Sequence, residues 1–332
     1  MILNGQSAAD VAQAAQLLAD GELVAFPTET VYGLGADAGN DAAVAKIFAA
    51  KGRPSDHPLI VHVADAAAVA PFAADGVPAF AQRLIDALWP GPLTLILPRR
   101  HGVGAAAAGG QASIGLRCPS HPVAQALLRA CAQATPAVHG LAGPSANQFG
   151  RVSPTTAAHV QAEFDASLAV LDGGPCEVGI ESTIVDCTRQ APVLLRPGVL
   201  TRAQIEAACG QPLRLPEDLQ SPAPRASGTL ESHYAPRAKV RLMDARALQA
   251  ALDVLGPDAA HIATWSRVIL RSASARIVRR RMPDDALEVA RQLFSVLRAF
   301  DDAGVRLIWV ETPPDAPEWE GVLDRLQRAA AG

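Results

Sequence analysis

The stretch Asp41-Ala-Ala-Val-Ala-Lys-Ile-Phe-Ala-Ala-Lys-Gly-Arg-Pro-Ser-Asp-His-Pro-Leu-Ile-Val-His62 decides the fold of the first part of the chain. Residues 41–50 predict an amphipathic helix, and Lys51-Gly52 supplies the basic last turn and the glycine that commonly end one. Arg53-Pro54 then opens a polar turn that leads into an apolar strand over Leu59–Val63. A helix followed at once by a short apolar strand is typical of α/β folds.

The same alternation extends in both directions from this stretch. Short apolar runs bounded by Gly, Pro or Asp predict strands, and Ala- and Leu-rich stretches between them predict helices. A mixed α/β domain with a large twisted sheet and flanking helices is therefore expected. The predicted strands are 23–26, 59–63, 93–97, 113–117, 168–171, 183–186 and 193–195, and the predicted helices are 8–19, 41–50, 79–88, 123–132 and 155–164.

A change in amino-acid composition separates a second region of the chain. Residues 211–236 carry Pro and Ser at positions that exclude a helix or a central strand, so they predict a linker. Beyond it, a smaller Rossmann-like α/β domain is expected, without the Gly-x-Gly-x-x-Gly fingerprint of a dinucleotide site. Its basic run Arg279-Arg-Arg281 could touch an anionic partner, but a solvated surface is the favoured interpretation. Its predicted strands are 240–243, 261–264 and 305–310, and its predicted helices are 245–255, 285–300 and 319–329.

The composition of the 332-residue chain limits its class. With 49% hydrophobic and 19% charged residues it is expected to be globular, and with no signal peptide or long apolar run to be cytoplasmic. The five cysteines are odd in number and widely spaced, which predicts buried free thiols. The net charge is −4, and residues 1–210 hold 12 Lys and Arg against 17 Asp and Glu. That acidic excess disfavours nonspecific nucleic-acid binding by the first domain.

Cationic and hydroxyl side chains from separate elements are expected to meet at one site. Guanidinium groups suit bidentate recognition of carboxylate or phosphate, and Gly- and Ser/Thr-rich loops let backbone approach a ligand closely. A polyanion site is therefore predicted, although the chain has no P-loop sequence. The cations are Lys51, Arg53, Arg117 and Arg196, His57 and His62 are expected at the same edge as Lys51 and Arg53, and the loops are Pro27–Gly35, Gly143–Asn147 and Gly150–Pro154.

Several of these residues allow a second interpretation. Lys51 could merely end its helix, and Ser153 could be either a plain N-cap or part of a phosphate-binding helix start. Glu29 could act as a general base, but holding neighbouring backbone or a cation is the favoured role. Three further histidines are interpreted as surface residues: His101, His121 and His159.

Taken in order, six segments resemble the YrdC/Sua5 family over about residues 10–205. The linker end Ser232-His-Tyr-Ala-Pro236 and the second domain are similar to the long two-domain Sua5 form. The resemblance implies a YrdC-like catalytic domain at 1–208, a Pro/Ser-rich linker at 209–238 that covers the active site, and a Sua5-type C-terminal domain at 239–332. One departure is Gln148-Phe149, where a small hydroxyl residue is frequent. The six segments are Pro27–Gly35, Lys51-x-Arg-Pro with Pro58–His62, Trp89–Thr94, Pro144–Asn147, Glu181–Asp186 and Leu195–Gly198.

The resemblance implies L-threonylcarbamoyladenylate synthase activity, in which L-threonine, bicarbonate and ATP give threonylcarbamoyl-AMP and pyrophosphate. Mg²⁺ would arrive with ATP, with no organic cofactor and no metal held directly by the protein. The product would pass to a tRNA threonylcarbamoyl-transfer complex that makes N6-threonylcarbamoyladenosine at position 37, and direct contact with tRNA is left open. No membrane partner is implied.

The family pattern also implies site residues, of which Lys51 and Arg53 carry the catalytic role by templating and electrostatics. The implied ATP-binding residues are Lys51, Arg53, His57, Ser113, Ser145, Ser153, Arg196 and Tyr234. The implied threonine-binding residues are Thr30, His62, Arg117, Gly143 and Ser182.

Two other functions fit the sequence less well. A carbamoyl-adenylate-forming relative would carry an acylphosphatase-like region and Cys-x-x-Cys zinc fingers, and this sequence has no Cys-x-x-Cys pair. An RNA-binding or ribosome-assembly module is disfavoured by the acidic balance of the first domain.

Overall fold

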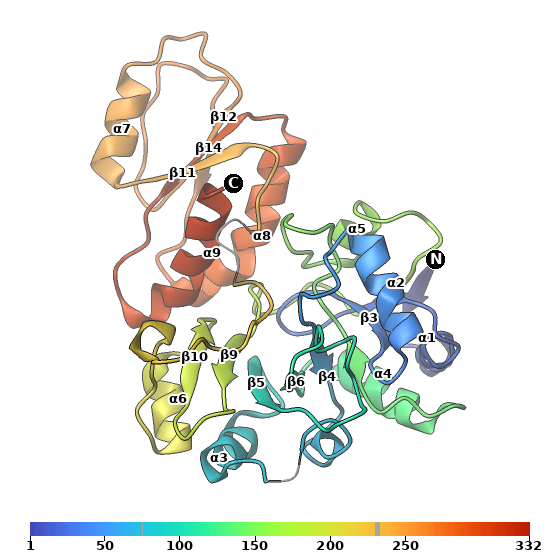
Figure 1. Cartoon of the computed structure of the whole chain (residues 1–332). Helices are drawn as coiled ribbons and strands as arrows, with labels where there is room; N and C mark the ends of the chain where they lie inside the picture. The colour runs from blue at the N-terminus through green and yellow to red at the C-terminus, as the bar shows by residue number, and fades with distance from the viewer. Residues whose placement is uncertain (75, 230–232) are drawn as a thin grey trace. The chain divides into compact units, whose positions relative to one another are not determined.

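The computed structural model describes residues 1–74, 76–229 and 233–332, and the chain forms two compact units (Figure 1). The first unit holds Met1–Phe149 and Ser153–Thr229. The second holds Gly150–Val152 together with the described residues from His233 onward. The expected linker 209–238 is thus divided between the two units, and its residues 230–232 lie outside the described part of the chain.

The first unit is organised around a mixed sheet, which confirms the expected fold class. Within the described residues this sheet has ten strands in the order β1-β8-β2-β3-β7-β4-β6-β5-β9-β10. The sheet contains parallel pairs, such as β4 with β6, and antiparallel pairs, such as β5 with β6. The strands are β1 (Ile2–Asn4), β2 (Val24–Phe26), β3 (Gly33–Asp37), β4 (Ile60–His62), β5 (Leu93–Pro98), β6 (Ser113–Arg117), β7 (Leu141–Ala142), β8 (Ala169–Asp172), β9 (Thr183–Asp186) and β10 (Val193–Arg196).

Helices cover both faces of this sheet because successive strand side chains point to opposite sides. In β2, Val24 and Phe26 join a buried cluster with α1 and α4, whereas Ala25 joins a cluster with α2 and α3. The two faces therefore carry separate hydrophobic cores. The helices of this unit are α1 (Ala8–Ala19), α2 (Asp41–Lys51), α3 (Ala79–Leu88), α4 (Pro122–Gln133), α5 (Ala157–Gln161) and α6 (Arg202–Cys209).

The glycine-rich segment Pro27–Gly35 differs from the loop that its composition suggests. Its end forms β3, which pairs antiparallel with β2. A Cβ atom at Gly35 would lie 2.9 Å from Phe26 Cε1, closer than side-chain contacts allow. Glycine is required here because the Phe26 ring lies directly against the backbone of β3.

The second unit has a parallel four-stranded sheet in the order β11-β14-β12-β13, which agrees with the Rossmann-like expectation. Leu307 and Trp309 pack with α7, while Ile308 and Val310 are fully buried on the opposite face. The sequence did not predict β13, whose four residues are all exposed. The elements are β11 (Lys239–Met243), α7 (Ala245–Asp253), β12 (Ile262–Ser266), β13 (Val278–Arg281), α8 (Ala286–Asp302), β14 (Leu307–Glu311) and α9 (Glu320–Ala330).

The burial of the cysteine and histidine side chains tests two of the expectations from the sequence. All five cysteines are free and buried, which confirms the thiol prediction. The placement of His121 at the surface is wrong, because only 7% of the residue is exposed. Its Nδ1 atom accepts the backbone N–H of Val123 at 3.2 Å and caps α4, a role that requires a position beneath the helix start. No helix among the described residues is long and apolar enough to cross a membrane.

Replacing Leu95 with Ala tests the core of the first unit. Leu95 lies in β5 with no exposed surface, so its truncation is expected to lower the free energy of unfolding by about 2–5 kcal/mol. Ile2→Ala on β1, at a residue 45% exposed, should cost less than about 1 kcal/mol. Urea unfolding followed by far-ultraviolet circular dichroism measures both, and equal losses would contradict the assigned core.

Candidate active site

Lys51 fastens the end of α2 to the loop Gly143–Asn147. The residue is 2% exposed, and its Nζ atom donates to the carbonyl oxygen of Ser145 at 2.5 Å and to that of Asn147. Burial, and after it the positive charge of Arg53, holds the pKa of the Lys51 ammonium well below its usual value. Gly52 follows with φ at 60°, a left-handed conformation that ends the helix. Lys51 therefore does more than end a helix.

Arg53 and His57 share one aromatic neighbour. The Arg53 guanidinium carbon lies 5.6 Å from the centroid of the Phe149 ring, and the His57 ring lies edge-on to it at 5.5 Å. Arg53 Nη2 also donates to the carbonyl oxygen of Pro58 at 2.9 Å. Partial burial and the Arg53 charge lower the pKa of His57. Two residues that the resemblance assigns to ATP are thus held side by side.

Arg196 lies at the end of β10 and is 2% exposed. Its Nε and Nη2 atoms donate to the carbonyl oxygen of Ser182 at 3.1 and 2.8 Å, and Nη2 reaches Ser182 Oγ at 3.2 Å. The Ser182 hydroxyl lies 2.7 Å from the hydroxyl of Thr94. Residues assigned to ATP and to threonine therefore meet at one buried point.

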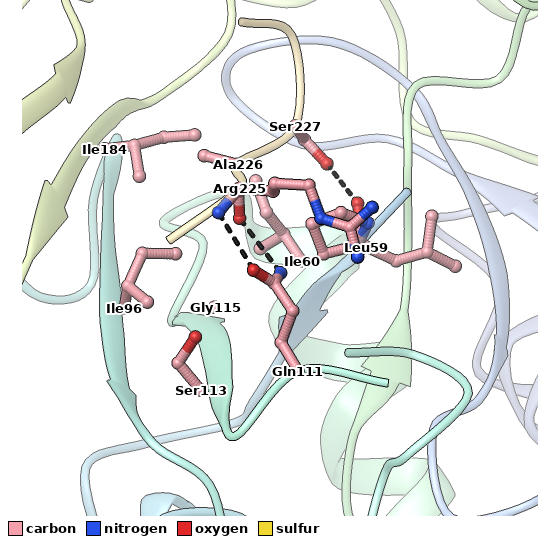
Figure 2. A pocket seen from close by; sticks show the side chains of 11 residues that line it. Leu59, Ile60, Ile96, Gln111, Ser113, Gly115, Ile184, Arg225, Ala226 and Ser227 are labelled. Atoms are coloured by element: carbon pink, nitrogen blue, oxygen red, sulfur yellow. Dashed lines mark hydrogen bonds between the residues drawn. The ribbon is translucent and has the colours of Figure 1, made fainter. Parts of the chain in front are cut away.

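A small pocket lies where the strands β4, β5, β6 and β9 meet, and Figure 2 shows its lining. Ile60, Ile96 and Ile184 supply apolar side chains, and Ser113 supplies a hydroxyl. Residues 225–227 border the pocket as well. Residues 225–227 of the expected linker therefore form one wall of this pocket.

Side chains from three elements hold this linker segment. Gln111 exchanges two hydrogen bonds with the backbone of Arg225, at 2.9 and 3.1 Å (Figure 2). Ser227 Oγ donates to the carbonyl oxygen of Pro58 at 2.7 Å and accepts from Arg53 Nη2 at 3.4 Å. Arg196 Nη1 donates to the Ser227 carbonyl oxygen at 2.9 Å. Both arginines assigned to ATP thus contact the same linker residue.

Arg117 and Glu29 form a buried ion pair. Arg117 Nη2 lies 2.6 Å from Glu29 Oε1, and the two side chains are 4% and 5% exposed. Arg117 Nη1 donates to Thr30 Oγ1 at 2.8 Å, and the backbone N–H of Ser120 donates to Glu29 Oε2 at 3.1 Å. These contacts agree with the interpretation that Glu29 holds backbone and a cation in place.

His62 pairs in register with Arg117 at the ends of β4 and β6. It is 3% exposed, and burial together with the Arg117 charge lowers its pKa to about 3, so the imidazole is neutral at pH 7. Its Nδ1 atom has no hydrogen-bond partner among the described residues. A Cβ atom at Gly143 would lie 2.9 Å from this nitrogen. Glycine at 143 therefore keeps space next to an available imidazole nitrogen.

The remaining assigned residues are Ser153 and Tyr234. Ser153 is fully buried, and its hydroxyl donates to Glu181. The N-cap interpretation of Ser153 is wrong, because the side chain of Thr156 accepts the N–H that caps α5. Tyr234 belongs to the second unit, where it is fully buried with its ring 5.4 Å from that of Phe294.

Other contacts in this region were not foreseen from the sequence. In the sequence, Phe149 stands out only as a departure from the family pattern, and Thr94 only as the end of a motif. Gln111 and Ser227 carry no local signal, since single polar residues in loops are common. Over the described ranges, no group of three or more His, Cys, Asp or Glu is arranged to hold a metal ion.

Two family models match the chain in succession. One, for the Sua5, YciO and YrdC proteins and described as "Telomere recombination", matches residues 16–198. The other, described as "Threonylcarbamoyl-AMP synthase, C-terminal domain", matches residues 200–331. The chain belongs to the Sua5/YciO/YrdC family. Because both models match, it has the two-domain Sua5 form.

Relatives of this Sua5-type chain match over nearly its whole length. A protein from Bacillus subtilis named threonylcarbamoyl-AMP synthase is 40% identical over 97% of this chain and 93% of its own. One of the same name from Pyrococcus abyssi is 36% identical over 96% and 93%. The crystal structure of P. abyssi Sua5 complexed with L-threonine superposes with a TM-score of 0.88 at 34% identity, covering 99% of this chain and 97% of the other.

The neutral state of His62 predicts a pH dependence of stability. Because its folded pKa of about 3 lies below the unfolded value near 6.5, the unfolded chain binds more protons between these values. The contribution of neutral His62 to the free energy of unfolding is complete above pH 6.5 and is lost as the pH falls toward 3. Lowering the pH from 7 to 5 should therefore reduce the free energy of unfolding of the wild type by about 2 kcal/mol more than it reduces that of the His62→Gln variant. Urea unfolding at both pH values measures this difference, and parallel losses would contradict a neutral buried His62.

Proposed function

We propose that the first unit forms threonylcarbamoyl-AMP and pyrophosphate from L-threonine, bicarbonate and ATP. The chain is a nucleotidyltransferase of the threonylcarbamoyl-AMP synthase type, as its full-length relatives are named. The observation that carries the proposal is the junction at Ser182, which joins the Arg196 side of the site to the side that holds Thr94. A two-substrate reaction needs such a junction, because both reactants must be held within bonding distance.

The phosphate side of the site is assigned to Lys51, Arg53, His57 and Arg196. The attacking carbamate and the ATP α-phosphate are both anions, so the site must offset their repulsion as the P–O bond forms. Arg53 and Arg196 supply permanent charge, while Lys51 holds the Ser145–Asn147 loop, whose Ser145 is proposed to contact ATP. Ser113 and Ser153 are proposed to add further polar contacts to ATP.

The amino-acid side of the site is assigned to Thr30, His62, Arg117, Gly143 and Ser182. P. abyssi Sua5 has been crystallised with L-threonine, and by similarity we assign this amino acid to the same place in the present chain. Arg117, which contacts Glu29 and Thr30, is proposed to attract the threonine carboxylate. The available Nδ1 atom of neutral His62 offers a hydrogen bond without adding charge.

Mg²⁺ is proposed to enter with ATP and to offset the charge of its phosphates. The cationic and hydroxyl character of the phosphate side fits a metal that is held by the nucleotide. The product is proposed to pass to the complex that transfers the threonylcarbamoyl group to tRNA.

Residues 225–227 are proposed to cover the ATP site and to rearrange when the nucleotide binds. Ser227 accepts hydrogen bonds from both Arg53 and Arg196. Phosphate oxygens would compete for the same guanidinium donors, since charge-assisted bonds to phosphate are the stronger ones.

A pyrophosphate-release assay tests the reaction. The purified full chain should release pyrophosphate from Mg-ATP only when L-threonine and bicarbonate are both present. Release that is independent of threonine, with carbamoyl phosphate accepted in its place, would favour the carbamoyl-adenylate alternative. Absence of release under every condition, in folded protein, would count against an enzyme.

Substitution of Arg196 tests the phosphate side. Arg196→Ala should lower kcat/KM for ATP by about 10–100-fold, because a charge-assisted hydrogen bond contributes roughly 1.5–3 kcal/mol. Arg196→Lys should recover only part of the loss, since lysine lacks the planar fork that reaches two acceptors. Arg129→Ala on α4 removes an equal charge where the side chain contacts Gln125, and should leave kcat/KM unchanged. A similar loss in the Arg129 variant would mean that overall charge, and not position, matters.

A further inference from the structure

The second unit contains a segment of one charge sign that the proposed reaction does not use. Residues 261–283 hold six arginines and no Asp or Glu, in a chain whose net charge is −4. The segment runs from β12 through a loop into the edge strand β13. Natural surfaces usually intersperse both signs, so this concentration calls for a physical explanation.

Two of the six arginines are paired with carboxylates. Arg267 Nη2 lies 2.5 Å from Glu311 Oε1, and Arg281 lies 3.6 Å from Asp284. The other four have no carboxylate within ion-pair distance among the described residues, and all four are exposed. We call these four the arginine surface: Arg271, Arg276, Arg279 and Arg280.

Backbone contacts hold most of the arginine surface in place. Gln249 of α7 exchanges two hydrogen bonds with the backbone of Arg271, at 2.9 and 3.0 Å. Arg279 Nη1 reaches the carbonyl oxygen of Leu270 at 3.4 Å, next to Arg271. Arg276 Nη1 reaches the carbonyl oxygen of Asp258 at 3.4 Å. The guanidinium groups therefore belong to an ordered loop and strand and keep most of their donors available to a partner.

The sheet register places these charges on both sides of an open edge. Arg279 aligns with Thr264 and Arg280 with Trp265, so the two side chains project to opposite faces of β13. Charges on an edge strand protect it from pairing with another chain, and Arg279 and Arg280 on β13 meet that need. Four exposed and carboxylate-free arginines exceed that need, and they match a ligand with regularly repeated negative charges.

We propose that the arginine surface binds the phosphate backbone of RNA. Exposed guanidinium groups on two faces of an edge suit phosphates that follow one another along a strand, and backbone contacts of this kind need no base recognition. The choice of RNA over DNA rests on the proposed function, whose product is consumed at a tRNA base. An acidic protein is the competing partner, and the experiment separates it from RNA.

The experiment compares three full-length proteins by fluorescence anisotropy with a labelled single-stranded RNA 20-mer. The test variant is Arg271→Ala, Arg279→Ala and Arg280→Ala, which removes three charges from the arginine surface. The matched control is Lys239→Ala, Arg241→Ala and Arg246→Ala, which removes three exposed charges on β11, the opposite edge of the sheet, and on α7. Affinities are measured between 50 and 200 mM salt.

The test variant should bind RNA at least tenfold more weakly than the wild type at 50 mM salt. The slope of log affinity against log salt should fall by about 2, since each lost phosphate contact contributes roughly 0.7 for single strands. The control should keep the wild-type affinity and slope. Pyrophosphate release should persist in all three proteins, which separates this proposal from the proposed function.

Several outcomes would overturn the proposal. The first is a wild type that does not bind RNA at 50 mM salt, and the second is equal weakening in the control. Tighter binding of polyglutamate than of RNA, with the same arginine dependence, would identify an acidic protein as the partner. A DNA 20-mer of the same sequence should bind with similar affinity and the same arginine dependence, because contacts to phosphate do not distinguish the two backbones, and DNA binding that survives the three substitutions would contradict a phosphate site at the arginine surface.

Discussion

The buried ion pair between Arg117 and Glu29 is the constraint on which the rest of the site depends. Removing two charges from water is costly, so such a pair persists only where further hydrogen bonds satisfy both groups. Here Thr30 and the backbone of Ser120 supply them. The pair links the end of β6 to the segment between β2 and β3, two places far apart in the sequence. After burial, which is the larger cause, the Arg117 charge also opposes protonation of the adjacent His62 imidazole and helps to lower its pKa.

The phosphate side follows a different principle. Lys51 is buried against carbonyl oxygens, whereas Arg53 and Arg196 direct guanidinium donors toward residues that border the pocket. A lysine is suited to the structural role because its single ammonium group can be enclosed by carbonyl oxygens. The planar guanidinium is suited to the exchange of one acceptor for another, as between Ser227 and a phosphate. The different roles of the lysine and the arginines therefore follow from the chemistry of their cationic groups.

Much of the fold could be predicted from the sequence. The helix 41–50 and the strand ending at His62 correspond to α2 and β4, because a local apolar pattern and a glycine stop leave few alternatives. Four strands escaped prediction, namely β1, β3, β7 and β13, and for β3 and β13 the physical reason is visible. β3 is rich in glycine because it lies against the Phe26 ring, and β13 is an edge strand with no buried side chain. Neither has the alternation that identifies a half-buried strand.

By itself, the sequence determined the α/β class and the two-domain family form, and it predicted that cations from separate elements meet at one site. Those features depend on local patterns and ordered motifs. Only the tertiary structure decided that Glu29 holds Arg117, that Phe149 lies between Arg53 and His57, and that Ser227 contacts both Arg53 and Arg196. The partners in these contacts come together through the crossovers of the sheet and the path of the linker. Burial, which sets the pKa of His62, is likewise a property of the packed fold and leaves no mark on a single stretch of sequence.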